Sequence, residues 1–146
     1  MATTKKKAET KTEFSNEELK HLEFIQNSIT QISTNASNTK TTAITFIAAN
    51  LLSATQNKNF ALVAMVGVLM FWFLDAYYLQ QARKLNGVYK DVAKLTNSNI
   101  DIKLFSAPTH LYTGGIYSYS ETLMSVTLLP LYSTMIIIFL FVFSFS

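Results

Sequence analysis

Two long blocks with almost no charge constrain the fold of this 146-residue chain more than any other feature. Within residues 41–79 the only charged side chains are Lys58 and Asp75, and residues 122–146 carry none. A soluble domain of this size distributes charge over its surface, whereas the core of a bilayer accepts apolar segments of about 20 residues. The sequence therefore predicts an all-α membrane protein with three transmembrane helices.

The first membrane segment is expected to be a hairpin of two helices over residues 38–79. Its second helix, 60–79, has full span length and carries aromatic residues toward its end, as interfacial belts do. Its first helix, 38–56, reaches span length only when the polar turn around Lys40 is included. The Lys40 ammonium can then extend to the membrane interface along its aliphatic stem.

The third span is expected to cover residues 122–146, with a kink at Pro130. Residues 80–121 precede it. Apolar residues there continue the helical period of the second span to about Leu95, so this helix should project from the membrane. Alternating side chains and flanking turn residues then predict a small β-hairpin within residues 100–119.

The N-terminal part divides into a Lys-rich tail, residues 1–14, expected to be disordered, and an amphipathic helix, residues 15–37. Ser15 and Glu18 have the spacing of a capping box, which predicts where the helix starts. One narrow apolar seam follows at helical spacing: Leu22, Ile25, Ile29, Ile32 and Ala36. Its partner could be the protein's own cytosolic helix, lipid headgroups, or the same helix of other subunits.

The Lys and Arg residues predict the orientation. Six lie in the segment that ends at Lys40, one (Lys58) lies in the turn of the hairpin, and five lie in residues 80–121. Positive charge is retained on the cytoplasmic side, so the N-terminus and residues 80–121 are expected in the cytoplasm of a multi-pass protein of the bacterial inner membrane. Lys40 and Asp75 then reach similar depth, and we expect either an ion pair that locks the hairpin or a functional site.

Residues that could carry catalysis are not found in the sequence. The chain has no cysteine, and its two histidines, His21 and His110, are far apart without acidic residues at metal-ligand spacing. Residues Gly114 and Gly115 lack the lysine and spacing of a phosphate-binding loop. We expect neither an enzyme nor a bound metal or cofactor.

One face of the first span is small and polar. On a helical wheel this face contains Asn38, Thr42, Thr45, Ala49, Ser53 and Gln56. Such a face permits close packing of helices, or it lines a pore whose hydroxyls and amides replace part of an ion's hydration shell. Both interpretations favour a homo-oligomer, because three helices of this size cannot enclose a conduit alone.

The cytosolic segment offers basic and aromatic residues that could bind a ligand. The candidates are Arg83, Lys84, Tyr89, Lys90 and Lys103. Basic groups beside aromatic faces suit a nucleotide or a single-stranded oligonucleotide, and they also suit the anionic lipids of the inner leaflet.

Three blocks of the sequence resemble a family of small bacterial membrane proteins with three spans. The block FWFLDAYYL at residues 71–79, with the basic helix after it, is similar to the family's Trp-x-Leu-Asp-Ala-Tyr-Tyr-Leu signature at the end of the second span. The block SVTLLPLY at 125–132 resembles the start of the family's third span, and Asn35 and Lys40 match positions before the first. Ala36 and Ala82 stand where the family usually has Ser and Glu. Both lie on the cytosolic side, so they bear on the regulatory ligand more than on the membrane core.

The resemblance extends to the ion-channel effector of the Hailong anti-phage system, which is encoded beside a nucleotidyltransferase whose oligonucleotide product controls the channel. It implies a homo-oligomeric channel, a tetramer, that depolarises the infected cell, with a nucleotidyltransferase as partner and an oligonucleotide as ligand. Two alternatives remain open. One is a non-conducting membrane adaptor that docks a cytosolic partner, and the other is a holin-like, membrane-disrupting toxin.

Overall fold

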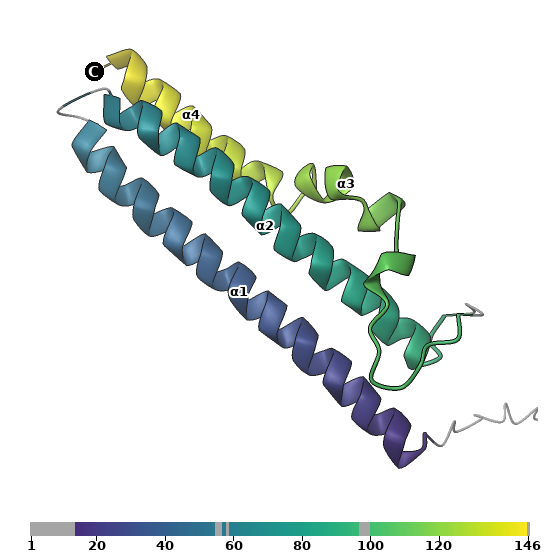
Figure 1. The fold of residues 1–146 in the computed structure, drawn as a ribbon. Helices are drawn as coiled ribbons and strands as arrows, with labels where there is room; N and C mark the ends of the chain where they lie inside the picture. Colours follow the sequence, from purple (N-terminus) through teal and green to yellow (C-terminus); the bar gives the residue numbers. More distant parts are fainter. Residues whose placement is uncertain (1–13, 55–56, 58, 97–99, 146) are drawn as a thin grey trace, which may run out of the picture.

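The computed structural model describes residues 14–54, 57, 59–96 and 100–145 (Figure 1). In these ranges the chain is all-helical, as expected, and the tail predicted for residues 1–14 lies outside them except for Phe14. The elements are α1 (Asn16–Ala54), α2 (Asn59–Val92), the 3-10 turns η1 (Thr109–Leu111) and η2 (Gly115–Tyr117), α3 (Tyr119–Leu123) and α4 (Leu129–Phe145).

Helix α1 is one continuous helix of 39 residues, about 58 Å long at 1.5 Å per residue. The boundary predicted at residue 37, between an amphipathic helix and a first span, is therefore not a structural boundary. Neither Gly nor Pro occurs within α1 to interrupt it. The predicted capping box is confirmed at its start, since Glu18 accepts a hydrogen bond from the Ser15 backbone N–H at 2.8 Å and Ser15 Oγ accepts one from the Glu18 N–H at 3.1 Å.

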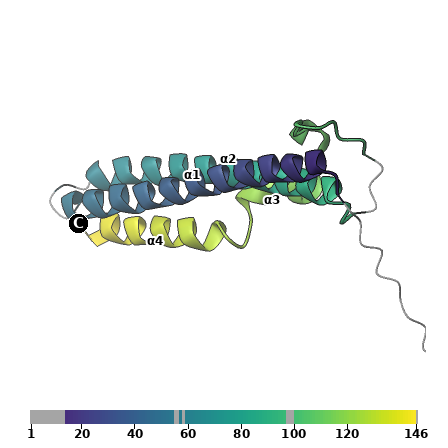
Figure 2. The ribbon, with the colours of Figure 1, turned by 90° about the horizontal axis from the view of Figure 1, so that it is seen from below.

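Helices α1 and α2 lie side by side as a long antiparallel pair (Figures 1 and 2). Toward the closed end of the pair, Ala43, Ala54, Ala61 and Ala64 are buried, and such small side chains let two helices approach closely. Toward the other end, Ile25 and Ile29 of the apolar seam pack on α2 and on the segment after it. The chain's own α2 is thus a partner of this part of the seam.

Helix α4 corrects the prediction for the third span. It begins at Leu129 rather than at residue 122, and the chain before it forms the separate short helix α3. Pro130 lies in the first turn of α4 and produces no kink, because a proline at that position lacks only an N–H that has no helical partner anyway. Helix α4 packs mainly along α2, with Tyr132 and Phe139 fully buried (Figure 2).

The β-hairpin predicted within residues 100–119 is wrong, since the described residues of that segment contain no strand. The segment instead forms a loop that contains η1 and η2 and packs against α2. Tyr112 and Tyr117 pack edge to face over Gly87, with ring centroids 5.3 Å apart. An isolated two-stranded hairpin is marginally stable, whereas these rings gain burial against an existing helix.

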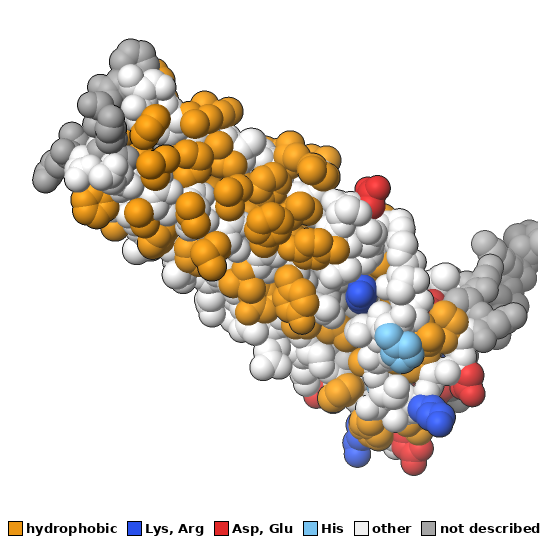
Figure 3. Space-filling model, turned by 45° about the horizontal axis from the view of Figure 1, so that its top comes forward, with side chains coloured by type: hydrophobic (Ala, Val, Ile, Leu, Met, Phe, Trp, Pro, Cys, Tyr) orange, Lys and Arg blue, Asp and Glu red, His pale blue; other side chains and the backbone are white. Residues whose placement is uncertain are grey.

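Exposed apolar side chains cover one end of the molecule and charged ones gather at the other (Figure 3). Among the described helices, only α2 has both the length and the composition of a membrane span; α4 is apolar but shorter, and α1 does not meet the criterion. In the most apolar 18-residue window of α2, only 28% of the residues are buried, so most of this apolar window lies at the surface of the chain.

Candidate functional site

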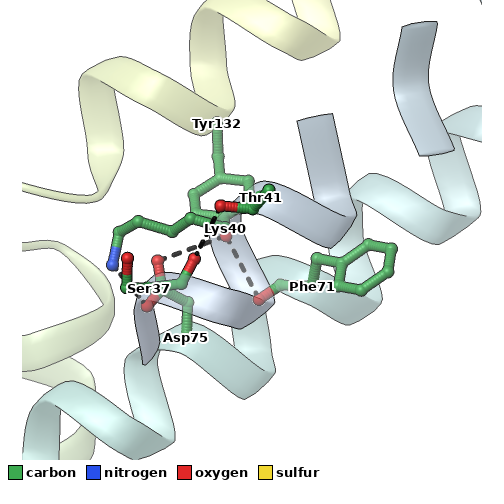
Figure 4. Close-up of polar contacts among 6 residues, drawn as sticks. All are labelled: Ser37, Lys40, Thr41, Phe71, Asp75 and Tyr132. Carbon is green, nitrogen blue, oxygen red and sulfur yellow. Dashed lines mark hydrogen bonds and ion pairs between the residues drawn. The ribbon is translucent and has the colours of Figure 1, made fainter. Parts of the chain in front are cut away.

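A buried carboxylate joins the three long helices near the middle of the bundle (Figure 4). The Lys40 ammonium in α1 lies 2.7 Å from Asp75 Oδ1 in α2, which is the pair that the sequence predicts. The second carboxylate oxygen, Oδ2, accepts a hydrogen bond of 3.2 Å from the hydroxyl of Tyr132 in α4. That hydroxyl also lies 3.4 Å from the Phe71 carbonyl oxygen.

Because the Asp75 carboxylate is buried, its charge has to be balanced by neighbouring groups. The Asp75 side chain is fully buried, while one third of the Lys40 side chain remains exposed. A carboxylate removed from water stays ionised only when positive charge and hydrogen-bond donors replace its hydration. Lys40 and Tyr132 supply these, so the arrangement can hold three helices in one register. Sequence reasoning missed Tyr132, although a tyrosine within an otherwise apolar helix indicates a buried partner for its hydroxyl.

The proposed pore face lies on the exposed side of α1, and its Asn38 and Thr42 also line a cavity against α2. Asn38, Thr42, Thr45 and Ala49 are exposed, Ser53 is half-buried, and Gln56 lies outside the described residues. We call the four exposed residues the polar strip. The Thr42 hydroxyl donates to the Asn38 carbonyl oxygen at 2.9 Å, and that of Thr45 donates to Thr41 at 3.0 Å. With their hydrogens directed to the helix backbone, the hydroxyl oxygens present lone pairs to the outside.

Beside the polar strip, two adjoining cavities form a groove between α1 and α2. The first, about 390 Å³, has a polar lining that includes Asn35, Asn38, Thr39, Thr42 and Tyr78, so two residues of the polar strip also border it. The second, about 650 Å³, is almost entirely apolar and includes Phe46 and Met70. Both cavities are also lined by Phe71 and Leu74. We call them together the α1–α2 groove, which changes from polar to apolar toward the closed end of the hairpin.

The predicted ligand-binding residues do not form one site. Arg83 donates hydrogen bonds to the Ile116 carbonyl oxygen at 3.1 Å and to Thr122 Oγ1 at 3.3 Å, so it secures η2 and α3 against α2. Tyr89 packs into the apolar cluster around Val88, and Lys84 is half-buried. Of the five candidates, Lys90 and Lys103 are the exposed residues.

A cavity of about 720 Å³ lies at the charged end of the bundle, between the start of α1, the end of α2 and the following loop. None of the five ligand candidates lines it. Its charged lining is Glu18, Asp91, Lys94 and Asp101, which is net acidic and disfavours an anion. Tyr112 donates a short hydrogen bond to Asp91. Burial raises the pKa of that phenol most, followed by this hydrogen bond and then by the Asp91 charge.

The two histidines have different surroundings. His21 is buried in α1, with Nε2 2.9 Å from the Ser106 carbonyl oxygen, and it packs against Phe105. His110 is exposed at η1. In the described part of the chain, no three His, Cys, Asp or Glu residues come together as a metal site. His21 thus has a structural contact that ties α1 to the loop.

Comparisons with known proteins give no match: no protein-family model fits the chain, and neither a curated protein nor a solved structure is significantly similar to it. The function therefore has to be argued from the residues of this chain and their arrangement.

Proposed function

We propose that this protein crosses the bacterial inner membrane three times, through α1, α2 and α4, with its N-terminus in the cytoplasm. The apolar surface of α2 and α4 supports this arrangement, as does the placement of the charges at the opposite end (Figure 3). The basic residues Lys84, Lys90 and Lys103 would then lie on the cytoplasmic side, as the positive-inside rule requires. Lys40 and Asp75 would lie at the inner edge of the hydrocarbon core.

We further propose that the chain is not an enzyme but assembles, as a homo-oligomer, into an ion channel lined by α1. The exposed polar strip on α1 carries this proposal. In a monomer, Thr42 and Thr45 would face lipid within the bilayer and Asn38 would lie at its inner edge, whereas polar groups at this depth are usually placed against protein or water. Four copies around an axis would turn these groups toward a central conduit, and their outward lone pairs suit a cation that has shed part of its hydration.

The resemblance stated above leads us to propose a tetrameric effector of anti-phage defence, controlled by an oligonucleotide from a partner nucleotidyltransferase. The continuity of α1 supports such control, because its cytosolic half and the polar strip belong to one rigid rod. A ligand that moved the cytosolic half would also move the lining. Lys90 and Lys103 would contribute phosphate contacts, since both are exposed.

The proposal is tested by ion flux from liposomes that contain purified protein. Thr42→Val with Thr45→Val keeps the shape of both side chains but removes the outward oxygens. The matched control is Thr134→Val, which removes a hydroxyl from α4, where Thr134 donates to the Pro130 carbonyl oxygen at 2.7 Å. We expect wild type and the control to conduct ions, and the ion flux of the α1 variant to be at least tenfold lower than that of wild type. Equal flux in all three would refute a conduit along α1.

Control by a ligand needs a separate measurement. An oligonucleotide mixture produced by a nucleotidyltransferase should change the flux of wild type, and Lys90→Ala with Lys103→Ala should abolish that response without changing the basal flux. An unchanged response in this variant would remove both lysines from ligand binding. The same liposomes, loaded with a large dye, distinguish a holin-like lesion, which would release dye as well as ions.

The non-conducting adaptor is the second candidate, and exposed apolar side chains at the charged end favour it. Leu95, Phe105 and Ile116 are each more than half exposed there, although this end would lie in water. Such side chains are typical of a surface that docks a soluble partner. The adaptor predicts no ion flux from well-reconstituted protein, so the liposome experiment also separates the two functions.

A further inference from the structure

One flank of α1 borders a groove and the other carries a ridge of side chains. Polar and apolar residues follow each other in the same order along both. On one flank lies the α1–α2 groove. On the other, four exposed side chains at helical spacing form a ridge: Ser37, Thr41, Ile44 and Ala48. Ile44 precedes the groove residue Phe46 by two positions, about 200° around the helix. The groove and the ridge therefore face in nearly opposite directions. The polar strip lies between them, with Asn38 and Thr42 at the edge of the groove.

We propose that the groove of each protomer receives the α1 ridge of a second copy of this chain, in a head-to-tail contact that closes into a ring. This inference rests on the proposed channel and specifies its subunit interface. A heterologous contact of this kind joins two different surfaces and generates a ring when the rotation closes.

The ridge and the groove place residues of the same polarity at the same depth in the membrane, which supports the contact between them. In a ring whose axis is the membrane normal, the same residue of every copy lies at the same depth. Ser37 and Thr41 of the ridge then meet the polar part of the groove, which contains Asn35, Thr39 and Tyr78. Ile44 and Ala48 meet the apolar part around Met70. Polar side chains thus find hydrogen-bonding partners, and apolar ones find an apolar lining.

The polar lining of the groove explains why a second copy fits it better than a lipid chain does. Asn35, Asn38 and Thr42 line the groove, and an acyl chain offers their side chains no hydrogen bond. The Ser37 and Thr41 hydroxyls of a neighbouring α1 can pair with them, and Thr45 and Ala49 of the strip still face the axis of the ring. Ala48 is small, so it lets the neighbouring helix come close.

Cysteine crosslinking tests this interface without interference, because the chain has no native cysteine. Ile44→Cys is placed on the ridge and Met70→Cys in the groove; the two native side chains are 51% and 69% exposed. With a short bis-maleimide, we expect the double variant to give a ladder that ends at one largest species, the closed ring. Each single variant alone should give no dimer, and a co-assembled mixture of the two should stop at dimers.

Two further variants make the result decisive. Thr41→Cys with Leu74→Cys probes the same contact one turn away, so a folding defect in one pair does not decide the outcome. Ile44→Cys with Ile137→Cys joins the ridge to the exposed surface of α4 and should give no ladder. Dimers from a single variant would show a two-fold contact instead, and failure of both ridge–groove pairs would refute the interface.

Ion flux measured on the same preparations separates this inference from the proposed function. A ladder without flux would support the interface and refute the conduit. Flux without a ladder would support a channel that assembles through other surfaces.

Discussion

Tyr132 in α4 and Asp75 in α2 are joined by a hydrogen bond of 3.2 Å from the phenol to carboxylate oxygen Oδ2. The other oxygen of the same carboxylate accepts the Lys40 ammonium at 2.7 Å. Both Tyr132 and Asp75 are fully buried. One carboxylate therefore links α1, α2 and α4, and it depends on two partners that lie 35 and 57 residues away in the chain.

Removing the positive partner should cost more than removing the buried charge itself. Lys40→Met leaves the Asp75 carboxylate buried with only Tyr132, and such an uncompensated charge costs about 3–5 kcal/mol. Asp75→Asn removes the charge, and Lys40 can turn its partly exposed ammonium to solvent. We expect a smaller loss for Asp75→Asn and a near-normal free energy of unfolding for Lys40→Met with Asp75→Leu, measured by SDS titration in mild detergent. An additive loss in the double variant would contradict the ion pair.

Tyr132→Phe tests the hydrogen bond that attaches α4. The ring and its packing remain, so the expected loss is about 1–2 kcal/mol, the usual effect of leaving a buried charged acceptor one donor short. Tyr77→Phe is the control, because the Tyr77 side chain is half exposed on α2. If both variants unfold at the same SDS fraction as wild type, the Tyr132 hydroxyl does not stabilise the junction.

Gly67 should not tolerate a larger residue while Phe46 is present. A Cβ at this position would overlap Phe46 Cε1, and the Phe46 ring packs beside Phe71 at 5.9 Å between centroids. Gly67→Ala is expected to destabilise the α1–α2 pair by about 1–3 kcal/mol, as overpacking does. The double variant Phe46→Ala with Gly67→Ala should lose less stability than the sum of the losses in the two single variants. Strict additivity in thermal unfolding would contradict the contact.

Gly87→Ala should loosen the loop at the charged end without disturbing the other end. A Cβ there would lie 2.6 Å from Tyr112 Cδ1 and 3.0 Å from the Tyr117 hydroxyl oxygen. The two rings would have to leave α2, exposing the chain around them. We expect limited proteolysis within residues 100–121 to accelerate, with SDS unfolding nearly unchanged. Cleavage at the wild-type rate would show that the rings adapt in place.

The start of α1 should lose order in acid. Glu18 accepts hydrogen bonds from the Ser15 N–H and from Lys94, and these hold the pKa of its carboxyl below the usual value, the Ser15 bond most. An acid with a lowered pKa stabilises the fold fully above its ordinary pKa of about 4.3, and this stabilisation is lost as the pH falls through the lower folded value. The protection factor of the amides in the first turn of α1, which is the ratio of the intrinsic to the observed exchange rate at the same pH, should therefore fall below about pH 4 in wild type. In Glu18→Gln the protection factor should be lower at neutral pH and nearly independent of pH.

Local patterns predicted several features correctly. Ser15 and Glu18 marked the start of α1, because a capping box needs only residues within one turn. The Lys40–Asp75 pair followed from counting residues on both sides of a tight turn, since an antiparallel hairpin fixes which positions face each other. The apolar seam of α1 was also visible in the sequence, but its partner was not, because periodicity shows that a face is buried and not what buries it.

The sequence by itself determined that the chain is helical and where its apolar blocks lie, since both follow from side chains and spacing along a short stretch. The tertiary structure decided the rest. Pro130 opens α4 rather than kinking it, because the chain leaves α3 before the proline. Tyr112 and Tyr117 gain more from packing over Gly87 than from pairing as strands. Tyr132 reaches Asp75 only because α4 docks on α2, and that contact between distant residues depends on the packing of whole helices, which no local pattern records.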